Sequence, residues 1–279
     1  MIKFILLFFS IFPLRINHFI GTLIGRYLYF SKSKPWSVTR KNIAICFPDL
    51  TQSQQNDLIK SSLIEDGKSL SESGPICLTA FSTIQKHVRK TTGLSHLQSD
   101  RPILLLVPHF GCWEITGRVL SLVKPITSLY KPGKNKQHDA LLMQCRQQGD
   151  LTMVGADRKG VMQLQRAMRN GSLIGILPDQ YPGEGAGVVA PFFNQDTYSM
   201  TLLSKLARKH DAKVIMTWAK RLDKGRGYEL HLEPVEILSE KGTLVDDVCL
   251  MNKAIEKLVR TCPEQYLWSY KRFKPIIKY

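Results

Sequence analysis

Residues 102–114 read Pro-Ile-Leu-Leu-Leu-Val-Pro-His-Phe-Gly-Cys-Trp-Glu, and this stretch decides the predicted fold. Five consecutive apolar residues between two prolines are typical of a short strand buried on both faces. Residues 111–123, which come after this strand, are expected to form a helix. Because a buried strand leading into a helix is the recurring unit of α/β proteins, the stretch predicts a largely parallel sheet covered by helices.

The same alternation continues along the chain. Further strands are expected over residues 126–130, 151–154, 173–177, 213–219 and 228–233. Helices are expected over residues 51–70, 76–90, 138–148, 159–170, 199–210 and 244–261, with a loop rich in glycine and proline over 181–191. We therefore expect an α/β fold: one domain, residues 31–279, with a central, mostly parallel or mixed sheet flanked by helices.

The first 30 residues form a separate segment by charge and hydropathy. Residues 4–14 are strongly apolar, but the run stops at Arg15 and is too short to span a bilayer. A second apolar group follows at helical spacing. From Met1 to Pro48 the chain has seven Lys or Arg and no Asp or Glu. This pattern favours a membrane-associated helical segment, lying in the interface of an anionic leaflet or inserted as a shallow hairpin. The alternative is an ordinary pair of core helices.

The formal net charge of +16 calls for an anionic partner. Nucleic acid, an acidic membrane surface, a phosphorylated substrate and an acidic protein all qualify. The chain has no recognisable nucleic-acid-binding motif, and such a partner leaves the apolar N-terminus unexplained, so we expect no nucleic acid.

The cysteines and histidines give no sign of a metal site, so no metal or cofactor is expected. The six cysteines contain no C-x-x-C pair and the seven histidines no H-E-x-x-H spacing. In a chain of this length the cysteines argue against a disulfide scaffold, and free, mostly buried thiols in a reducing compartment are expected. The cysteines are Cys46, Cys77, Cys112, Cys145, Cys249 and Cys262.

His109 and Glu114 are the candidate catalytic pair. His109 directly follows the predicted strand, at the sheet edge where α/β proteins bind ligands. On one regular helix the two side chains would diverge by roughly 140°, so they can meet only if Pro108 and Gly111 break the chain before the helix. A carboxylate on one ring nitrogen would leave the other free to act as a general base. By itself the pair is a weak signal that fits a structural, hydrogen-bonded histidine better than a catalytic one, and Cys112 as a nucleophile is a weaker alternative.

Several further blocks, together with the pair, give the chain a family resemblance. It resembles the bacterial lipid A late acyltransferases, the lauroyl/myristoyl transferases, within the glycerolipid acyltransferase superfamily. The matching blocks, in family order, are Asn42-Ile-Ala-Ile-Cys-Phe-Pro48, Pro108-His-Phe-Gly-Cys-Trp-Glu114, Tyr130-Lys-Pro132, Arg158-Lys-Gly160, Asp179-Gln180 with Pro191-Phe-Phe193, and Trp268-Ser-Tyr-Lys-Arg-Phe-Lys274. They cover almost the whole chain.

The resemblance implies an O-acyltransferase. His109 would deprotonate a hydroxyl of a lipid A precursor, an anionic glycolipid, and Glu114 would orient His109 and stabilise its charged form. The hydroxyl would attack the thioester of an acyl donor, acyl-carrier protein or acyl-CoA, without a covalent acyl-enzyme. The expected location is the cytoplasmic face of the bacterial inner membrane, with the lipid surface as a further partner.

The resemblance also implies a substrate-binding set. Arg158 would bind phosphate or stabilise developing negative charge, and Asp179 and Gln180 would shape the acceptor site. Lys131, Lys271 and Arg272 would supply positive charge for lipid phosphates or the acidic carrier, and Tyr130, beside Lys131, belongs to the same substrate-binding set. Alternatives without a role in binding stay open: Arg158 can be a solvated arginine at a helix start, Asp179 a turn-forming aspartate, and the other basic residues solubilising surface charge.

Two departures from the family pattern leave the acceptor open. Cys112 stands where many relatives have asparagine or another polar residue, and Lys131 replaces a common arginine. An acyltransferase acting on another glycolipid or on a carrier-bound product would have much the same sequence. Competing functions of other classes are a noncatalytic membrane- or nucleic-acid-binding protein and a hydrolase that uses water as the acceptor.

Overall fold

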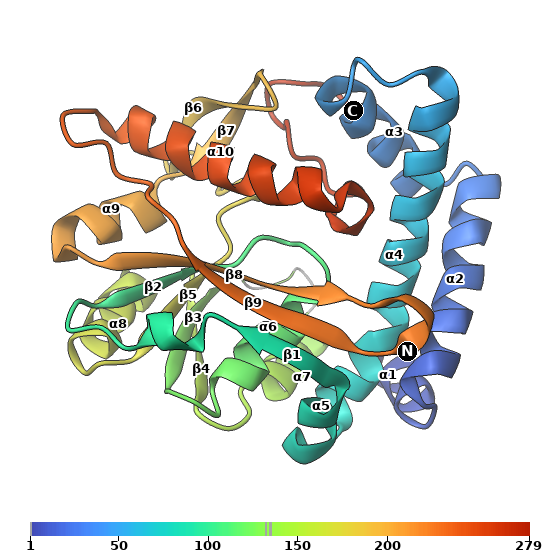
Figure 1. Cartoon of the computed structure of the whole chain (residues 1–279), viewed down its shortest axis with the longest axis horizontal. Coiled ribbons are helices and arrows are strands. Elements are labelled where there is room, and N and C mark those ends of the chain that lie inside the picture. Colours follow the sequence, from blue (N-terminus) through green and yellow to red (C-terminus); the bar gives the residue numbers. More distant parts are fainter. Residues whose placement is uncertain (1, 132, 134–135) are drawn as a thin grey trace.

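A mixed sheet forms the centre of the computed structural model, which describes residues 2–131, 133 and 136–279. Within these residues seven strands pair in the order β1-β9-β8-β2-β5-β3-β4 (Figure 1). Every neighbouring pair is parallel except β8 with β9. The strands are β1 (Val88–Thr92), β2 (Ile103–Leu106), β3 (Ile126–Tyr130), β4 (Leu151–Gly155), β5 (Leu173–Ile176), β8 (Lys213–Arg221) and β9 (Tyr228–Pro234). The predicted α/β class with a mixed central sheet is confirmed.

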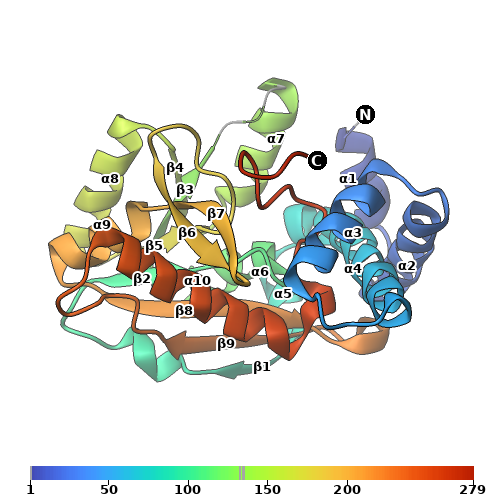
Figure 2. The ribbon, with the colours of Figure 1, turned by 90° about the horizontal axis from the view of Figure 1, so that it is seen from above.

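Helices cover both faces of this sheet. They are α1 (Ile2–Ser10), α2 (Leu14–Phe30), α3 (Lys34–Cys46), α4 (Gln52–Leu78), α5 (Phe81–His87), α6 (Trp113–Leu120), α7 (Lys136–Arg146), α8 (Arg158–Arg169), α9 (Leu202–His210) and α10 (Leu244–Thr261). Alternate residues of β2 serve the two cores: Leu104 and Leu106 pack toward α8, α9 and α10, and Leu105 packs toward α5 and α6. Figure 2 shows α10 running in roughly the same direction as β8 and β9, with α1 to α4 gathered at one end.

Two β elements lie where the sequence predicted something else. Strand β1 occupies the end of the predicted helix 76–90, because it pairs with β9, a partner about 140 residues away. A hairpin of β6 (Gly187–Phe192) and β7 (Gln195–Met200) replaces part of the predicted loop and the start of the predicted helix 199–210. Its two turn residues, Phe193 and Asn194, both have positive φ, which matches a tight hairpin turn. A phenylalanine is a poor sequence signal for such a turn.

The N-terminal helices pack against α4 through a polar and glycine-lined face. A Cβ on Gly67 of α4 would lie 2.1 Å from the carbonyl oxygen of Gly21 in α2, so only glycine permits this backbone approach. The buried face of α2 contains Asn17 and His18, whereas its aromatic residues face outward. Phe19 and Tyr27, for example, are 64% and 70% exposed. No helix in the described part of the chain combines the length and the hydropathy needed to cross a membrane.

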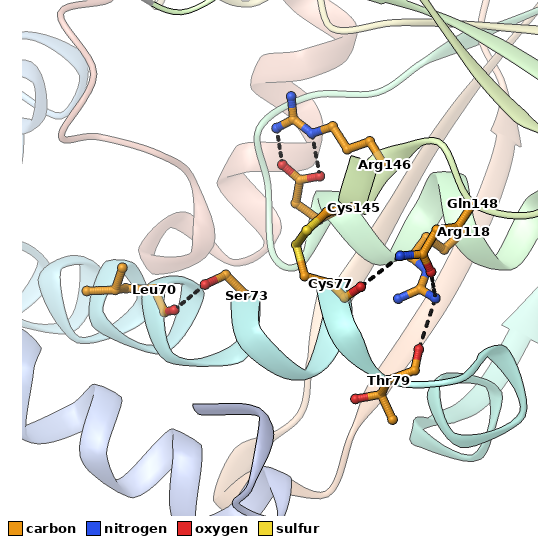
Figure 3. Close-up of a disulfide and its surroundings, with 9 residues drawn as sticks. Leu70, Ser73, Cys77, Thr79, Arg118, Cys145, Arg146 and Gln148 are labelled. Carbon is orange, nitrogen blue, oxygen red and sulfur yellow. Dashed lines mark hydrogen bonds and ion pairs between the residues drawn. A yellow bond between two sulfur atoms is a disulfide. The ribbon is translucent and has the colours of Figure 1, made fainter. Parts of the chain in front are cut away.

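A disulfide joins Cys77 at the end of α4 to Cys145 in α7 (Figure 3). This corrects the expectation that all six cysteines are free thiols. The other four, Cys46, Cys112, Cys249 and Cys262, are free. The bridge closes a loop between residues 68 positions apart, a pairing that no local cysteine motif announces.

Reducing this disulfide is expected to destabilise the folded chain. A cross-link over so long a loop restricts the unfolded ensemble, so Cys77→Ser should lower the free energy of unfolding by about 2–4 kcal/mol. The measurement is urea unfolding with and without reductant, and Cys249→Ser, which changes a free thiol, is the control. Equal stability of the oxidised wild type, the reduced wild type and Cys77→Ser would contradict the cross-link.

Candidate active site

His109 lies in a turn between β2 and α6, at the carboxyl edge of the sheet. The turn is fixed by the backbone N–H of Gly111, which donates to Gln265 O at 2.9 Å, and by that of Cys112, which donates to Ala219 O at 2.8 Å. Gly111 has φ +57, and a Cβ there would lie 2.1 Å from Ala219 O. The predicted break between strand and helix is therefore confirmed, and Gly111 is needed for it.

The hydrogen-bond partner of His109 is Asp179, which follows β5, the strand beside β2. His109 Nδ1 lies 2.7 Å from Asp179 Oδ1, and the His109 backbone N–H donates to Asp179 Oδ2 at 2.8 Å. When the Nδ1–H group donates a hydrogen bond to this carboxylate, Nε2 is the unprotonated ring nitrogen and carries the lone pair. The arrangement is that of an imidazole prepared to accept a proton.

The surroundings of Asp179 keep its carboxylate ionised. The side chain is 1% exposed, and burial alone would raise its pKa. The charge of His109 and the two hydrogen bonds from it more than offset burial, so the pKa of Asp179 lies below its ordinary value. A buried, ionised carboxylate can both orient the imidazole and stabilise its protonated form.

Glu114, the carboxylate that the sequence assigned to His109, is paired with Arg146 of α7. Arg146 Nε donates to Glu114 Oε2 at 3.0 Å, and Arg146 Nη2 donates to Oε1. Among the described residues no hydrogen bond joins Glu114 to His109. Burial would raise the pKa of Glu114, but Arg146 chiefly, and the charge of His109 in addition, lower it. Glu114 therefore acts on His109 through charge, while Asp179 makes the contact.

A cavity of about 460 Å³ opens beside His109 and extends under the sheet. At the carboxyl edge of the sheet it is lined by His109, Glu114 and Gln180, and at the amino edge by Ile126 and Leu151. The face of the sheet between these edges contributes alternate, mostly apolar residues. They are Leu105 and Val107, Ile126, Ser128 and Tyr130, Leu151 and Met153, and Gly175 and Leu177, and Leu129 lines the cavity in addition. Helices α4, α6 and α7 form the opposite wall. The cavity can hold an extended apolar group with one end at the imidazole.

Three further predicted site residues line the same cavity: Tyr130, Lys131 and Gln180. The Tyr130 hydroxyl donates to Asp139, close to the Glu114–Arg146 pair. Pro132, the last residue of that predicted block, lies outside the described residues.

The predicted basic residues are not all brought together. Arg158 is exposed at the start of α8 and is not among the residues that line the cavity. Lys271 lies over the ring of Tyr279, with Nζ 5.4 Å from its centroid. Arg272 is 1% exposed, and its Nη2 donates to Ser199 Oγ at 2.8 Å. Because its guanidinium fixes the C-terminal segment to β7, Arg272 is removed from the surface where we expected it to meet a phosphate.

A buried ion pair that the sequence did not reveal supports the His109 turn. Arg221, at the end of β8, contacts Glu72 of α4 through Nε at 3.0 Å and donates from Nη2 to Gly111 O at 3.0 Å. Glu72 also accepts from the Tyr228 hydroxyl at 2.9 Å and lies 3.1 Å from His18 Nε2. An arginine ending an apolar strand was the one sequence signal for this network. Burial would raise the pKa of Glu72, but Arg221 and His18 lower it far below its ordinary value.

Replacing Glu72 with leucine is expected to lower the free energy of unfolding by about 3–5 kcal/mol, because Arg221 would keep a buried charge without its main partner. Chemical denaturation measures this loss. The exposed Glu184→Leu, in the loop before β6, is a matched control and should change stability little.

The same pair predicts a dependence of stability on pH. The pKa of Glu72 is lower in the folded than in the unfolded state, so the stabilisation is fully present above the unfolded value near 4.5. It is lost as the pH falls from there toward the folded pKa. Glu72→Leu should flatten this part of the stability curve, and an unchanged slope would contradict the ionised pair.

Comparison with known proteins identifies the family of the chain. The family model for bacterial lipid A biosynthesis acyltransferases matches residues 1–275. The chain is 28% identical over 273 residues to a lipid A biosynthesis palmitoleoyltransferase of Escherichia coli K12, covering 94% of this chain and 86% of that protein. It is 25% identical over 267 residues, with the same coverage, to the lipid A biosynthesis lauroyltransferase of that organism. It is 28% identical over 246 residues to a lipid A biosynthesis acyltransferase of Haemophilus influenzae, covering 85% of this chain and 77% of that protein.

A single family model thus spans the His109 turn, the cavity and the N-terminal helices together. The chain belongs to the bacterial lipid A biosynthesis acyltransferase family, and it is an acyltransferase that acts in the synthesis of lipid A.

Proposed function

We propose that the enzyme transfers a fatty acyl chain from acyl-carrier protein, or from acyl-CoA, to a hydroxyl of a lipid A precursor. One observation carries this proposal: His109, held by a buried carboxylate, lies at one end of a mostly apolar cavity. An ester-forming enzyme needs both a base for the hydroxyl and an apolar site for the chain.

In the proposed reaction His109 Nε2 accepts the proton of the acceptor hydroxyl as its oxygen attacks the thioester carbonyl. The tetrahedral intermediate then collapses, the carbon–sulfur bond breaks, and the leaving thiolate takes the proton from the imidazolium. The products are an ester and a free thiol, and no acyl group becomes attached to the enzyme. His109 is regenerated in its starting form.

Two carboxylates assist His109 in this proposal, in different ways. Asp179 fixes the tautomer through its 2.7 Å contact with Nδ1 and stabilises the imidazolium. Glu114 contributes negative charge nearby, and Arg146 holds it in position. The orienting role that the sequence assigned to Glu114 therefore passes to Asp179.

The acyl chain would occupy the apolar cavity beneath the sheet, with its thioester at the carboxyl edge beside His109. Lys131 and Gln180, which line the cavity at that edge, are positioned to contact polar groups of the acceptor. Lys131 is exposed and could pair with a phosphate.

The test of this function is acyl transfer by the purified full chain. It is supplied with an acyl-carrier-protein thioester and a lipid A precursor, and the lipids are analysed by mass spectrometry. We expect the precursor to gain the mass of one ester-linked acyl chain. Release of the chain as free fatty acid, with the lipid unchanged, would instead identify a hydrolase.

We also propose that the outer face of α1 and α2 lies on an anionic lipid leaflet, at the cytoplasmic face of the bacterial inner membrane. Large apolar side chains are exposed along both helices, although α2 has buried polar residues on its inner face. The exposed apolar residues of the two helices are Phe4, Leu7, Phe8, Ile16, Phe19, Leu23, Tyr27 and Phe30, and Ile11 is exposed in the turn between them. Exposed Arg15 and Arg26 lie on the same helix as several of them. Aromatic and basic residues together are typical of an interfacial surface.

Replacing Phe19 and Tyr27 together with serine is expected to weaken binding to vesicles that contain anionic lipid. Each substitution removes a large apolar area that would be buried in the lipid interface. The partition coefficient between vesicle and water should therefore fall by about tenfold or more. Co-sedimentation with anionic and with neutral vesicles measures the effect. Met162→Ser, an equally exposed position on α8, is the control, and equal loss in both proteins would contradict a specific surface.

A further inference from the structure

A buried polar group lies in the wall of the cavity, although the lining is mostly apolar. Arg118 of α6 lines the cavity and is only 2% exposed. Its Nη2 donates to Gln148 Oε1 at 2.6 Å and to Thr79 O at 3.1 Å (Figure 3). Gln148 in turn donates from Nε2 to Cys77 O at 2.8 Å. Gln148 and Thr79 do not line the cavity, so Arg118 stands between the cavity and the groups that hold it.

His109 lies just before the start of helix α6, and Arg118 lies near the other end of that helix. The helix begins at Trp113, whose ring centroid lies 5.2 Å from that of His109. Arg118 comes five residues later, which corresponds to a rise of about 7.5 Å along the helix. Gln148 lies three residues before the start of β4, at the amino edge of the sheet, whereas His109 follows β2 at the carboxyl edge. An acyl chain with its thioester at His109 would therefore run toward Arg118.

A buried guanidinium is an unfavourable neighbour for a growing hydrocarbon chain. A methyl end that reaches Arg118 gains no further apolar contact unless the side chain moves. Movement would separate Arg118 from Gln148 and Thr79 and leave buried polar groups without these partners, which costs more than one buried methylene gains. Burial of the guanidinium lowers the pKa of Arg118 to about 10.

We propose that Arg118, held in place by Gln148, is the stop that limits the length of the acyl chain in this cavity. The proposal rests on the proposed function in one respect, because it takes the cavity as the acyl site. Arg118 is thus a specificity-determining residue and takes no part in the chemistry at His109.

A purely structural role for Arg118 makes a different prediction. If the arginine serves only to tie the end of α4 to the segment before β4, its loss lowers stability but leaves the preference for chain length unchanged. The preference among donors, measured as a ratio within one reaction mixture, is independent of how much enzyme remains folded. That ratio separates the two roles.

The decisive variant is Arg118→Met, which keeps an unbranched side chain but removes the charge. The full-length protein receives an equimolar mixture of saturated acyl donors from decanoyl to stearoyl, and the products are quantified by mass spectrometry. Use of the donor two carbons longer than the wild-type preference, relative to the preferred donor, should rise by about tenfold, the effect of burying two more methylenes. Gln148→Leu, which only releases Arg118, should shift the ratio in the same direction by less.

Two other variants calibrate the measurement. Gly175 lies on the cavity face of β5, and a Cβ there would lie 2.9 Å from Ser128 Oγ. Gly175→Val should therefore narrow the cavity and shift use toward shorter donors. Arg169→Met, at an exposed arginine at the end of α8, should leave the wild-type profile unchanged.

Failure of this inference can be distinguished from failure of the proposed function. Binding of the matching free fatty acids, measured by native mass spectrometry, gives the length limit without any transfer. A shift toward longer fatty acids in the Arg118→Met or Gln148→Leu binding profile supports the stop even if the wild type transfers no acyl chain, an outcome that would overturn the function alone. An unchanged profile in both variants, with Gly175→Val shifted toward shorter chains, overturns the stop.

If none of the three variants changes either profile, the acyl chain does not lie in this cavity and the inference also fails. Should Arg118→Met not fold, Gln148→Leu decides between the same outcomes.

Discussion

Replacing His109 with glutamine is expected to lower the rate of acyl transfer by about 10²–10⁴-fold, the usual contribution of a positioned general base. Glutamine has a similar extent and can still donate a hydrogen bond to Asp179, but it cannot accept and carry a proton. The loss should appear in kcat, because the apolar cavity that binds the chain is unaltered. Steady-state kinetics with a defined acyl donor and lipid A precursor measure it.

The control for this variant is its fold. The thermal unfolding midpoint and the binding of a fatty acid should stay close to those of the wild type, since His109 lies at the edge of the cavity and not in either apolar core. Transfer within a few-fold of the wild-type rate, by a folded His109→Gln protein, would rule out His109 as the base.

Replacing Asp179 with asparagine is expected to lower kcat by about 10²–10³-fold, although the side chain keeps its size. The amide carries no charge to stabilise the imidazolium, and its NH₂ group can face Nδ1 and favour the tautomer with a protonated Nε2. The depressed pKa of Asp179 shows that the ionised form is the one the folded protein holds. The measurement is kcat as a function of pH for the wild type and the variant.

Glu114→Gln is the matched comparison, because it removes the other negative charge near the same imidazole. Its effect should be smaller, about tenfold, which corresponds to one pKa unit of electrostatic support. Glu114 is one-third exposed and paired with Arg146, whereas Asp179 is almost completely buried and contacts His109 directly. A larger loss in Glu114→Gln than in Asp179→Asn would restore the role that the sequence pattern first suggested for Glu114.

Asp179 contacts His109 and Glu114 does not, and this difference comes from the order of strands in the sheet, not from spacing along the chain. Glu114 is five positions from His109 but starts a helix whose first turn points it toward α7. Asp179 is 70 positions away, but β5 lies beside β2, so the residues that follow the two strands meet at one edge. A pattern read along the sequence favours near neighbours, and here the contact is made by a distant one.

The outward apolar face of α2 is a second feature that spacing along the chain left undecided between two alternatives. Helical spacing marked the aromatic residues of this segment as one face, and a core helix would turn that face inward. The close approach of Gly21 and Gly67 instead sets the polar and small face against α4. The side chains left outside are those that a lipid interface would accommodate.

The sequence by itself determined the strand over 103–106, the break before α6, the position of His109 at a ligand-binding edge and the membership of the family. These features depend on local hydropathy, on proline and glycine, and on short blocks in a fixed order. Only the tertiary structure decided that Asp179 contacts His109, that Cys77 meets Cys145, that Arg272 is buried and that Arg118 lines the cavity while Gln148 and Thr79 hold it. Each of these depends on which strands and helices become neighbours, and that is settled by packing across the whole sheet, which spacing along the chain does not encode.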